Sequence, residues 1–308
     1  MNVLVTGGAG FIASNLVDSL LYEGYRVTVV DNLTKGDSSH VSAKASFYQA
    51  NILDNKLDRI FSDTCPEVVF HFAAQVDVQT SMNRPEHDAM SNIIGTINVL
   101  QCCIKYGVKK IIYASTAAVY GVPSFIPLSE EHPKNPISFY GASKYAPERY
   151  IELFSELHGL DYTILRYANA YGMRQDPSGE GGVVSIFLSK LLKGKPIVIF
   201  GDGEHTRDFV YVKDIVAANL AAISEGRNQI YNVSCNRQTS INQLLRLICK
   251  LTGRSFEPMY SPARKGEIIH SCLNNTKAVL ELGWKPQYDL EHGLQETINY
   301  YRENLINT

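Results

Sequence analysis

The segment SFYGASKYAPERY contains a tyrosine and a lysine one helical turn apart, at Tyr140 and Lys144. Residues i and i+4 share one face of a helix, so these two side chains would lie side by side. A nearby ammonium favours the phenolate and would lower the pKa of Tyr140 from its ordinary value of about 10. Such a phenol is suited to act as a general base that removes a hydroxyl proton during hydride transfer.

A hydroxyl partner for this pair is available in the segment YASTAAVYG, where Ser115 and Thr116 end an apolar run typical of a strand. Ligands of open α/β sheets bind beyond the carboxyl ends of the strands, so Thr116 would share a hydrogen bond with Tyr140 and a substrate oxygen. We therefore expect Thr116, Tyr140 and Lys144 to form the catalytic group. Alone, a tyrosine–lysine pair at this spacing is more often an ordinary surface pair, so its assignment as catalytic depends on the motifs in the rest of the chain.

The N-terminal segment VLVTGGAGFIAS supplies a glycine-rich turn between a strand-like run and a helical pattern. Gly7 permits the tight turn, and Gly10 lets backbone N–H groups approach a pyrophosphate at the start of the helix. Asp31 closes the next strand-like run, where a carboxylate accepts hydrogen bonds from the adenosine ribose and repels a 2′-phosphate. The pattern predicts that the cofactor is NAD rather than NADP.

Short runs rich in Val and Ile alternate with amphipathic segments over the first half of the chain. The expected strands are 2–6, 26–31, 45–50, 67–73, 109–115 and 161–168, and the expected helices are 11–23, 54–62, 88–106 and 141–158. Such apolar strands separated by helices predict a doubly wound, parallel α/β sheet of the Rossmann type, covered on both faces.

The alternation of strand-like and helical segments becomes less regular after residue 168. Further helices are expected at 183–194, 212–226, 240–252 and 290–304, with strands at 197–203 and 229–234. We predict an NAD-binding domain over 1–168, to which 206–235 returns. A smaller mixed α/β substrate domain is predicted over 169–205 and 236–308.

Bulk composition excludes several classes of protein. The 308 residues are 45% hydrophobic and 19% charged, with a formal net charge of −2 and scattered Lys and Arg, so no nucleic-acid partner is expected. Neither a signal peptide nor a membrane span is expected, because the apolar runs are short and lack a basic leader. The six cysteines show no metal-ligand spacing. They predict free thiols in the cytoplasm and no bound metal.

Motifs along nearly the whole chain resemble the extended short-chain dehydrogenase/reductase family, and more narrowly its UDP-glucose 4-epimerase branch. They are TGGAGFIAS, DNLTKG, HFAAQVDVQTS, SNIIGTINVL, ASTAAVYG, SFYGASK, LRYANAYG, FGDGEHTRDFVYVKDI and ARKGE. The resemblance implies NAD as cofactor, a UDP-sugar as substrate and a homodimer that pairs the helices near 88–106 and 141–158.

The resemblance also implies individual roles. The residues expected to contact NAD are Gly7, Gly10, Phe11, Ile12, Asp31, Asn32, Asn51, Ile52, Phe72, Ala73, Ala74, Gln75, Asn92, Ser115, Tyr140, Lys144, Tyr167 and Ala168. Those expected to contact the UDP-sugar are Thr116, Tyr140, Asn169, Val183, Val184, Phe200, Arg207, Arg264, Glu267 and Ser271. Asn51 departs from the acid common in the family, but its carbonyl oxygen could still accept from the adenine amine.

The expected reaction inverts C4 of UDP-glucose or UDP-galactose through a transient 4-keto sugar. Relatives that eliminate water or decarboxylate carry acids directly after the active-site threonine, whereas Ala117 and Ala118 follow Thr116 here. Ser271 is small where a bulky residue excludes N-acetyl sugars, so UDP-GlcNAc and UDP-GalNAc are further expected substrates.

Three alternatives remain open from the sequence. UDP-glucuronate would need a cation near the sugar, for which Arg174 is the candidate. A catalytically silent NAD-binding regulator would be expected to lack the tyrosine or the lysine, and both are present. An NADPH-dependent sugar reductase is disfavoured by Asp31.

Pro147 lies three residues beyond Lys144, inside the helix expected at 141–158. It has no N–H for the Ser143 carbonyl, and its ring crowds that carbonyl. We therefore predict a local bend or a weakened hydrogen bond there, without loss of the alignment of Tyr140 and Lys144.

Overall fold

The computed structural model describes residues 1–178, 182–263 and 268–305. Within these residues, seven strands form one sheet in the order β11-β6-β5-β4-β1-β2-β3, and every neighbouring pair is parallel. The order reverses between β1 and β4, as in a doubly wound sheet. The predicted fold class is therefore confirmed. The strands are β1 (Asn2–Thr6), β2 (Arg26–Asp31), β3 (Ser46–Gln49), β4 (Val68–His71), β5 (Lys110–Thr116), β6 (Asp161–Tyr167) and β11 (Gln229–Val233).

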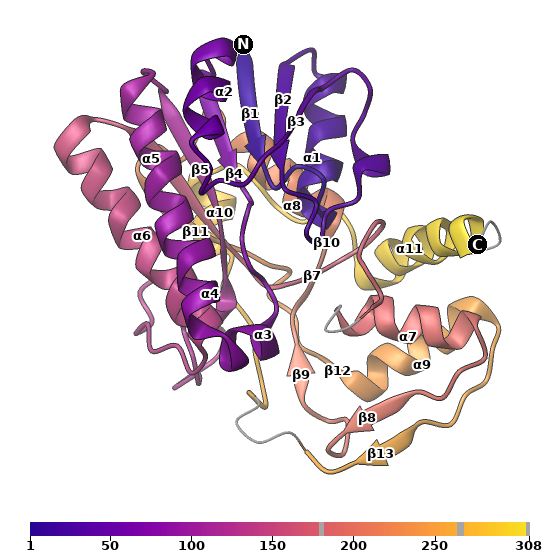
Figure 1. Cartoon of the computed structure of the whole chain (residues 1–308). Coiled ribbons are helices and arrows are strands. Elements are labelled where there is room, and N and C mark those ends of the chain that lie inside the picture. The colour runs from indigo at the N-terminus through magenta and orange to yellow at the C-terminus, as the bar shows by residue number, and fades with distance from the viewer. Residues whose placement is uncertain (179–181, 264–267, 306–308) are drawn as a thin grey trace.

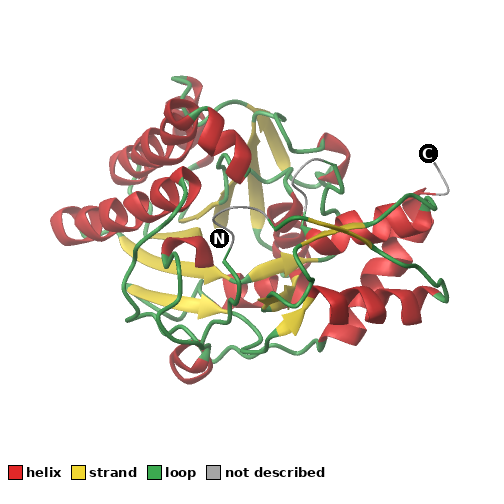
Figure 2. Cartoon of the chain, turned by 90° about the horizontal axis from the view of Figure 1, so that it is seen from below, coloured by secondary structure: helices red, strands yellow, loops and turns green. Residues whose placement is uncertain are grey.

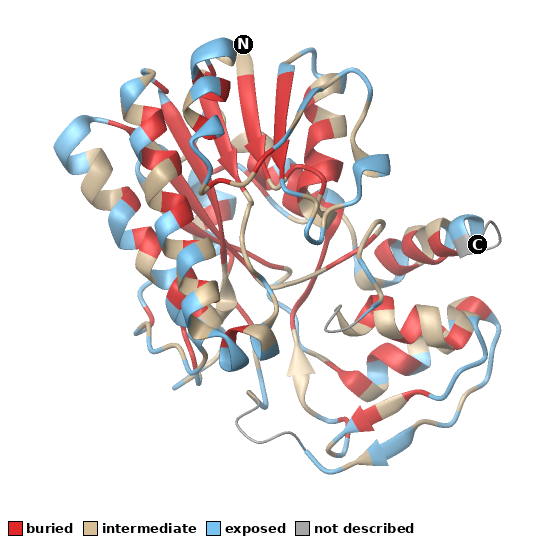
Figure 3. Cartoon of the chain, in the orientation of Figure 1, coloured by how far each residue is buried: buried red, intermediate tan, exposed pale blue. Residues whose placement is uncertain are grey.

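Helices cover both faces of this sheet (Figures 1 and 2). One face packs against α1 (Phe11–Tyr22), α8 (Val212–Ala221) and α10 (Thr276–Glu281), and the other against α2 (Lys56–Thr64), α5 (Gly95–Lys105) and α6 (Phe139–His158). Side chains alternate between the faces: Val3 and Val5 join the cluster that contains Leu16, whereas Leu4 joins the cluster that contains Phe61. The central strands are accordingly buried along most of their length, whereas the edge strand β3 is largely exposed (Figure 3).

The C-terminal part packs around its own buried cluster, which includes Phe187, Leu244 and Ile298. These side chains come from α7 (Val183–Leu192), α9 (Ile241–Thr252) and α11 (Leu290–Leu305). Short strands pair beside them: β7 (Asn169–Tyr171) with β10 (Phe209–Tyr211), β8 (Val198–Phe200) with β13 (Met259–Ser261), and β9 (Thr206–Arg207) with β12 (Thr239–Ser240). β8 lies within the strand expected at 197–203. The other five short strands were not predicted, because two or three residues carry no measurable periodicity, and the six-residue α10 was not predicted either.

The helix predicted at 88–106 is divided in the structure. A short helix α3 (Val78–Asn83) precedes α4 (Pro85–Ala89), and a π-turn over Met90–Ile94 joins α4 to α5. Single π-turns inside helices are frequently found at functional sites. Asn92, predicted to contact the cofactor, lies in this turn.

The second half of the chain returns to the main sheet through β11, α8 and α10. β11 pairs with β6, and α8 contacts α1, although α8 ends at Ala221 rather than at the predicted residue 226. The two-domain division itself stays a prediction. Across the described residues, no helix combines the length and apolar character that a membrane crossing needs.

Helix α6 runs unbroken from Phe139 to His158 with Pro147 inside it, and both Pro147 and Lys144 are buried. The bend predicted at Pro147 stays a prediction.

A buried ion pair ties α6 to the sheet. Arg166 of β6 donates to Glu148 of α6 through Nη2 (2.6 Å) and Nε (3.0 Å), and both side chains are at most 2% exposed. Ser115 Oγ at the end of β5 donates to the same carboxylate at 2.5 Å. The Tyr120 hydroxyl and the Glu130 carbonyl accept from the Arg166 guanidinium. The pair therefore joins two central strands to the helix that carries Tyr140 and Lys144.

A buried histidine joins β1 and β4 to the π-turn. His71 Nδ1 lies 2.7 Å from the Thr6 hydroxyl, and Nε2 lies 2.9 Å from the Thr96 hydroxyl, which itself donates to the Asn92 carbonyl. Burial, with a smaller effect of the Lys144 charge, lowers the pKa of His71 to about 3. The imidazole is therefore neutral in the folded protein at neutral pH.

Removing the Glu148 carboxylate should strongly destabilise the fold. We expect Glu148→Ala to lower the free energy of unfolding by about 3–5 kcal/mol, because it leaves the Arg166 charge buried without its partner. The matched control is Glu152→Ala on the same helix, whose carboxylate pairs with the exposed Arg149 and should contribute at most about 1 kcal/mol. Urea unfolding measures both; equal losses would contradict the expectation.

The stability of the protein should fall as the pH drops below the ordinary histidine range. The pKa of His71 is about 3 in the folded state and about 6.5 in the unfolded chain. Its contribution is therefore present above about pH 6.5 and is lost as the pH falls toward about 3. His71→Gln should flatten this part of the pH dependence in urea unfolding, whereas substitution of the exposed His158 by Gln should not. An unchanged slope in His71→Gln would refute the assignment.

Candidate active site

The predicted cofactor residues follow the strands of the main sheet. Gly7 comes directly after β1, Asp31 ends β2, Phe72 follows β4, and Ser115 and Thr116 end β5. Because the strands are parallel, their carboxyl ends share one edge of the sheet, and the structure brings these residues together there.

The glycine loop forms a cradle that larger residues would fill. Gly7 has a φ of 68°, and its N–H donates to the Val30 carbonyl at 2.7 Å. A Cβ at Gly7 would lie 2.7 Å from the backbone nitrogen of Ala73. Helix α1 starts at Phe11 with Gly10 as its N-cap and no side-chain cap. Its first N–H groups are therefore available to an anion such as a pyrophosphate, and the loop fits the predicted dinucleotide.

Asp31 is held beside this loop. Its carboxylate accepts from the Ala9 N–H (3.0 Å) and the Leu33 N–H (2.8 Å), and its side chain is buried. Each carboxylate oxygen can accept more than one hydrogen bond, so capacity remains for ribose hydroxyls. This arrangement fits NAD.

The residues predicted around the adenosine follow β2 and β3, and of these Asn32 is exposed and Asn51 is half-buried. Asn32 Oδ1 accepts from the Thr34 N–H at 3.0 Å, and Asn51 Oδ1 accepts from the Leu53 N–H at 3.0 Å. Asn51 therefore keeps one acceptor site for the adenine amine rather than two, and Ile52 next to it is buried.

Helix α6 presents Tyr140 to Thr116. Ser138 caps the helix through the Gly141 N–H, and the Tyr140 N–H donates to Ser81 Oγ at 3.0 Å. Thr116 ends β5 next to this helix, and its hydroxyl acts to lower the pKa of the Tyr140 phenol. The ammonium of Lys144 lies 4.3 Å from the centre of the Tyr113 ring, and Lys144 is 4% exposed.

The predicted direction of the Tyr140 pKa is wrong for this structure. Burial raises the pKa of Tyr140 to about 12, the Thr116 hydrogen bond opposes that rise, and the Asp88 charge adds to it. Burial also lowers the pKa of Lys144 to about 7, partly offset by Glu148 and Asp88. Lys144 is buried and Tyr140 is half-buried, and withdrawal from water is the largest cause of both pKa shifts.

A buried polar cluster surrounds the predicted residues Gln75 and Asn92. Asn92 Oδ1 accepts from the Gln75 N–H at 2.7 Å, and Asn92 Nδ2 donates to Ser143 Oγ at 2.8 Å. The Gln75 amide donates to Asp88 at 2.7 Å. Ala73 and Ala74 lie half-buried just before this cluster.

The sequence reasoning missed Ser81, Asp88 and Glu148. Glu148 repeats the spacing of four residues beyond Lys144, and Asp88 lies four residues before Asn92. The helical periodicity thus contained a signal for both carboxylates.

The end of β6 leads from the cofactor edge toward the C-terminal part. Tyr167 packs on Phe72 with ring centres 6.4 Å apart, and its hydroxyl contacts Asn219. Ala168 and Asn169 follow, and the Asn169 N–H donates to the Asp208 carbonyl at 2.8 Å.

The predicted substrate residues of the C-terminal part lie on separate elements. Val183 and Val184 begin α7, and Phe200, 36% exposed, ends β8. Arg207 of β9 donates to the Thr206 and Ile269 carbonyls, and the Ser271 N–H donates to the same Thr206 carbonyl. The structure therefore brings Arg207 and Ser271 together. The predicted residues Arg264 and Glu267 lie outside the described residues.

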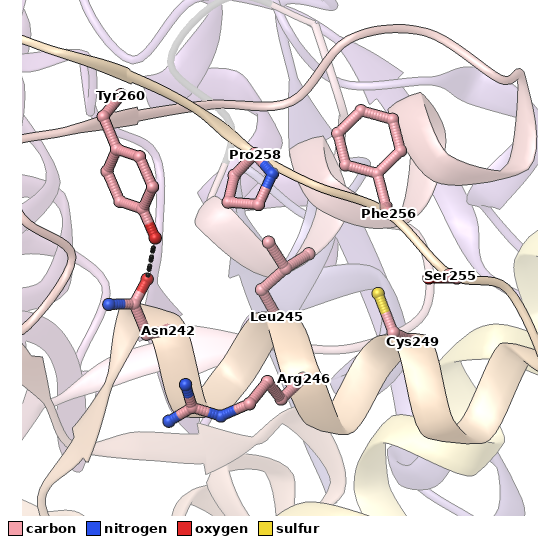
Figure 4. Close-up of a pocket in the computed structure, with 8 residues that line it drawn as sticks. All are labelled: Asn242, Leu245, Arg246, Cys249, Ser255, Phe256, Pro258 and Tyr260. Carbon is pink, nitrogen blue, oxygen red and sulfur yellow. Dashed lines mark hydrogen bonds between the residues drawn. The ribbon is translucent and has the colours of Figure 1, made fainter.

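A surface pocket of about 280 Å³ lies elsewhere, on the outer side of α9. Figure 4 shows Leu245, Phe256 and Pro258 lining it, with a hydrogen bond of 3.1 Å between the Tyr260 hydroxyl and Asn242. No predicted site residue lines this pocket, so we do not include it in the candidate active site.

Comparisons with known proteins agree with this geometry. The family model for the NAD dependent epimerase/dehydratase family matches residues 3–234. The UDP-glucose 4-epimerase of Mycolicibacterium smegmatis is 41% identical over 309 residues, which cover 98% of this chain and 99% of the relative. The crystal structure of UDP-glucose 4-epimerase with UDP-glucose from Thermotoga maritima has a TM-score of 0.97 and 49% identity, and the match covers 99% of this chain and 100% of that one.

A further solved structure resembles the chain almost as closely. The Thermus thermophilus UDP-glucose 4-epimerase, in complex with NAD, has a TM-score of 0.93 and 37% identity, and the match covers 98% of this chain and 99% of that one. A family model that matches most of the chain and relatives that cover nearly all of it lead to one conclusion. The chain belongs to the NAD dependent epimerase/dehydratase family.

Proposed function

We propose that the chain is an NAD-dependent 4-epimerase that interconverts UDP-glucose and UDP-galactose through a transient 4-keto sugar. The observation that carries this proposal is the placement of Tyr140 and the buried Lys144 on α6 beside Thr116, at the carboxyl edge of the sheet. The relatives named UDP-glucose 4-epimerase support the choice of substrate.

In the proposed mechanism, Tyr140 removes the proton of the 4-hydroxyl and returns it after the sugar has turned. Thr116 would hold the substrate oxygen next to the Tyr140 phenol, and the Lys144 ammonium lies on the same face of α6 as that phenol. When bound, NAD would supply the acceptor for the C4 hydride, its reduced form would return that hydride, and its positive charge would favour the phenolate. Gly7, Gly10 and Asp31 would hold the dinucleotide.

Epimerisation is favoured over elimination because the turn after Thr116 lacks acids. Ala117 and Ala118 occupy the 3₁₀ turn that directly follows the threonine, and neither carries an ionisable group. The chain thus offers groups for oxidation and reduction at C4 but no evident acid and base for C5 and C6.

The UDP-glucuronate alternative is weakened by the position of Arg174. Its Nη2 donates to the Asp18 carboxylate of α1 at 2.7 Å, so the candidate cation for a sugar carboxylate already has an anionic partner. A neutral hexose needs no such cation.

We also propose a homodimer formed by the helical segments 88–106 and 141–158, and a cytoplasmic location. The exposed side chains of Met90, Ile94, Tyr145 and Leu157 give these helical segments an apolar outer surface that a second copy would cover. All six cysteines, which lie among the described residues, are unpaired, as is usual in a reducing compartment.

The small side chain of Ser271 supports a broader substrate range. Ser271 is half-buried beside Arg207, and its short side chain leaves room that a larger residue would occupy. We therefore include UDP-GlcNAc and UDP-GalNAc among the proposed substrates.

Loss of the Tyr140 hydroxyl should abolish most of the activity. We expect Tyr140→Phe to lower kcat by about 10²–10⁴-fold while the protein retains bound NAD, because only the proton transfer is lost. The assay follows the conversion of UDP-galactose to UDP-glucose by NMR. Tyr145→Phe, on the exposed side of α6, is the matched control and should keep normal rates. Near-normal turnover by Tyr140→Phe would refute the assignment of the base.

Enlarging Ser271 should narrow the substrate range. We expect Ser271→Tyr to lower kcat/KM for UDP-GalNAc by about 10-fold or more and to change that for UDP-galactose little, because only the N-acetyl group needs the space. Ser255→Tyr, at an exposed position after α9 and away from the proposed substrate residues, is the control. Equal loss with both substrates would contradict the proposed role of position 271.

A further inference from the structure

Asp88 is a buried carboxylate that the proposed reaction has not used. It is 0% exposed, and its Oδ1 accepts from the Gln75 amide at 2.7 Å. Its Oδ2 is also buried and has no hydrogen-bond partner among the described residues. A buried carboxylate oxygen without a donor is costly, so the position calls for a reason other than packing.

The Asp88 carboxylate faces the catalytic helix. Asn92 Nδ2 lies 3.3 Å from Asp88 Oδ1 and donates to Ser143 Oγ of α6 at 2.8 Å. Tyr140, Ser143 and Lys144 are spaced three and four residues apart, so they share one face of α6. Asp88 therefore lies across the Asn92 amide from the face that carries the phenol and the ammonium.

We propose that Asp88 is a positioning residue for the Tyr140–Lys144 pair, and that it acts through its negative charge. This inference rests on the proposed role of Tyr140 as the base. A negative charge favours the protonated form of every group near it, so Asp88 keeps Lys144 as an ammonium and resists ionisation of Tyr140. Tyr140 and Lys144 then each lose their proton at a higher pH than they would beside a neutral side chain.

The other groups around the pair do not duplicate this effect. Glu148 acts on Lys144 from α6 but is committed to Arg166. His71 on β4 is neutral, and burial holds the pKa of the Tyr113 phenol on β5 well above its ordinary range, so neither carries charge at neutral pH. Asp88 is the carboxylate that raises the pKa of both Tyr140 and Lys144.

This dual action has a distinctive consequence. Removing the charge should lower the pKa of both groups, so both limbs of the bell-shaped pH profile of kcat/KM should move toward acid together. A residue that only shapes the site would lower the height of the profile and leave its limbs in place.

The test compares two neutral substitutions of different shape, Asp88→Asn and Asp88→Ser. We expect both to move the two limbs by about 0.5–1 pH unit toward acid. Titration of lysine Cε by ¹³C NMR, with the Lys144 signal identified by its loss in Lys144→Arg, should give the same direction in protein without substrate. Glu152→Gln, which removes a carboxylate from the outer side of α6, is the control and should shift neither readout.

Three outcomes would overturn the proposal: limbs and Lys144 signal unmoved in a folded variant, an equal shift in Glu152→Gln, or failure of both Asp88 variants to fold. The last would mean that the carboxylate is needed for packing. The NMR titration separates this inference from the proposed function. If Lys144 shifts as expected while the wild-type protein leaves UDP-galactose unchanged, the charge effect stands and the epimerase proposal fails.

Discussion

The catalytic helix is arranged around the buried ion pair of Arg166 and Glu148. Two charges leave water without large loss only where good geometry and further hydrogen bonds replace hydration. Here the guanidinium meets the carboxylate at two points, and Ser115 donates to the same carboxylate. Glu148 lies one turn beyond Lys144, so the pair fixes the rotation of α6 about its axis. The directions of Lys144 and Tyr140 follow from that rotation.

The burial that removes this ion pair from water also sets the protonation of Tyr140 and Lys144. Burial raises the pKa of Tyr140 to about 12 and lowers that of Lys144 to about 7. These shifts oppose the phenolate and the ammonium that a base of this kind needs. Carboxylates near the pair stabilise the Lys144 ammonium and destabilise the Tyr140 phenolate, so fixed negative charges cannot favour both charged forms. A positive charge that arrives with a ligand would favour the phenolate without this conflict, which links activation of the base to an occupied site.

Much of the fold was predictable because its signals are local. The apolar β-branched runs marked the strands of the main sheet, and the spacing of Gly7, Gly10 and Asp31 marked the cradle at its edge. The short pairs such as β7 with β10 were not predictable, since their strands form through distant partners. The direction of the Tyr140 pKa was predicted wrongly for the same reason. The sequence reveals which charges lie one helical turn apart but not how far the packing of α4 and β4 withdraws them from water. Asp88 acquires its place beside α6 only when α4 docks.

The proposed base and the proposed nucleotide contacts belong to different parts of the molecule. Tyr140 and Thr116 lie on α6 and β5 of the main sheet, whereas Phe200 and Arg207 lie on short strands of the C-terminal part. An epimerase has to present both faces of C4 to one bound cofactor, so the nucleotide must be held while the sugar turns. A sugar held tightly by the catalytic elements could not turn. The separation of these elements therefore suits epimerisation better than a one-way oxidation. It also separates Tyr140 on α6 from position 271, which is tied to β9 through the Thr206 carbonyl and which we propose to set the space for the sugar.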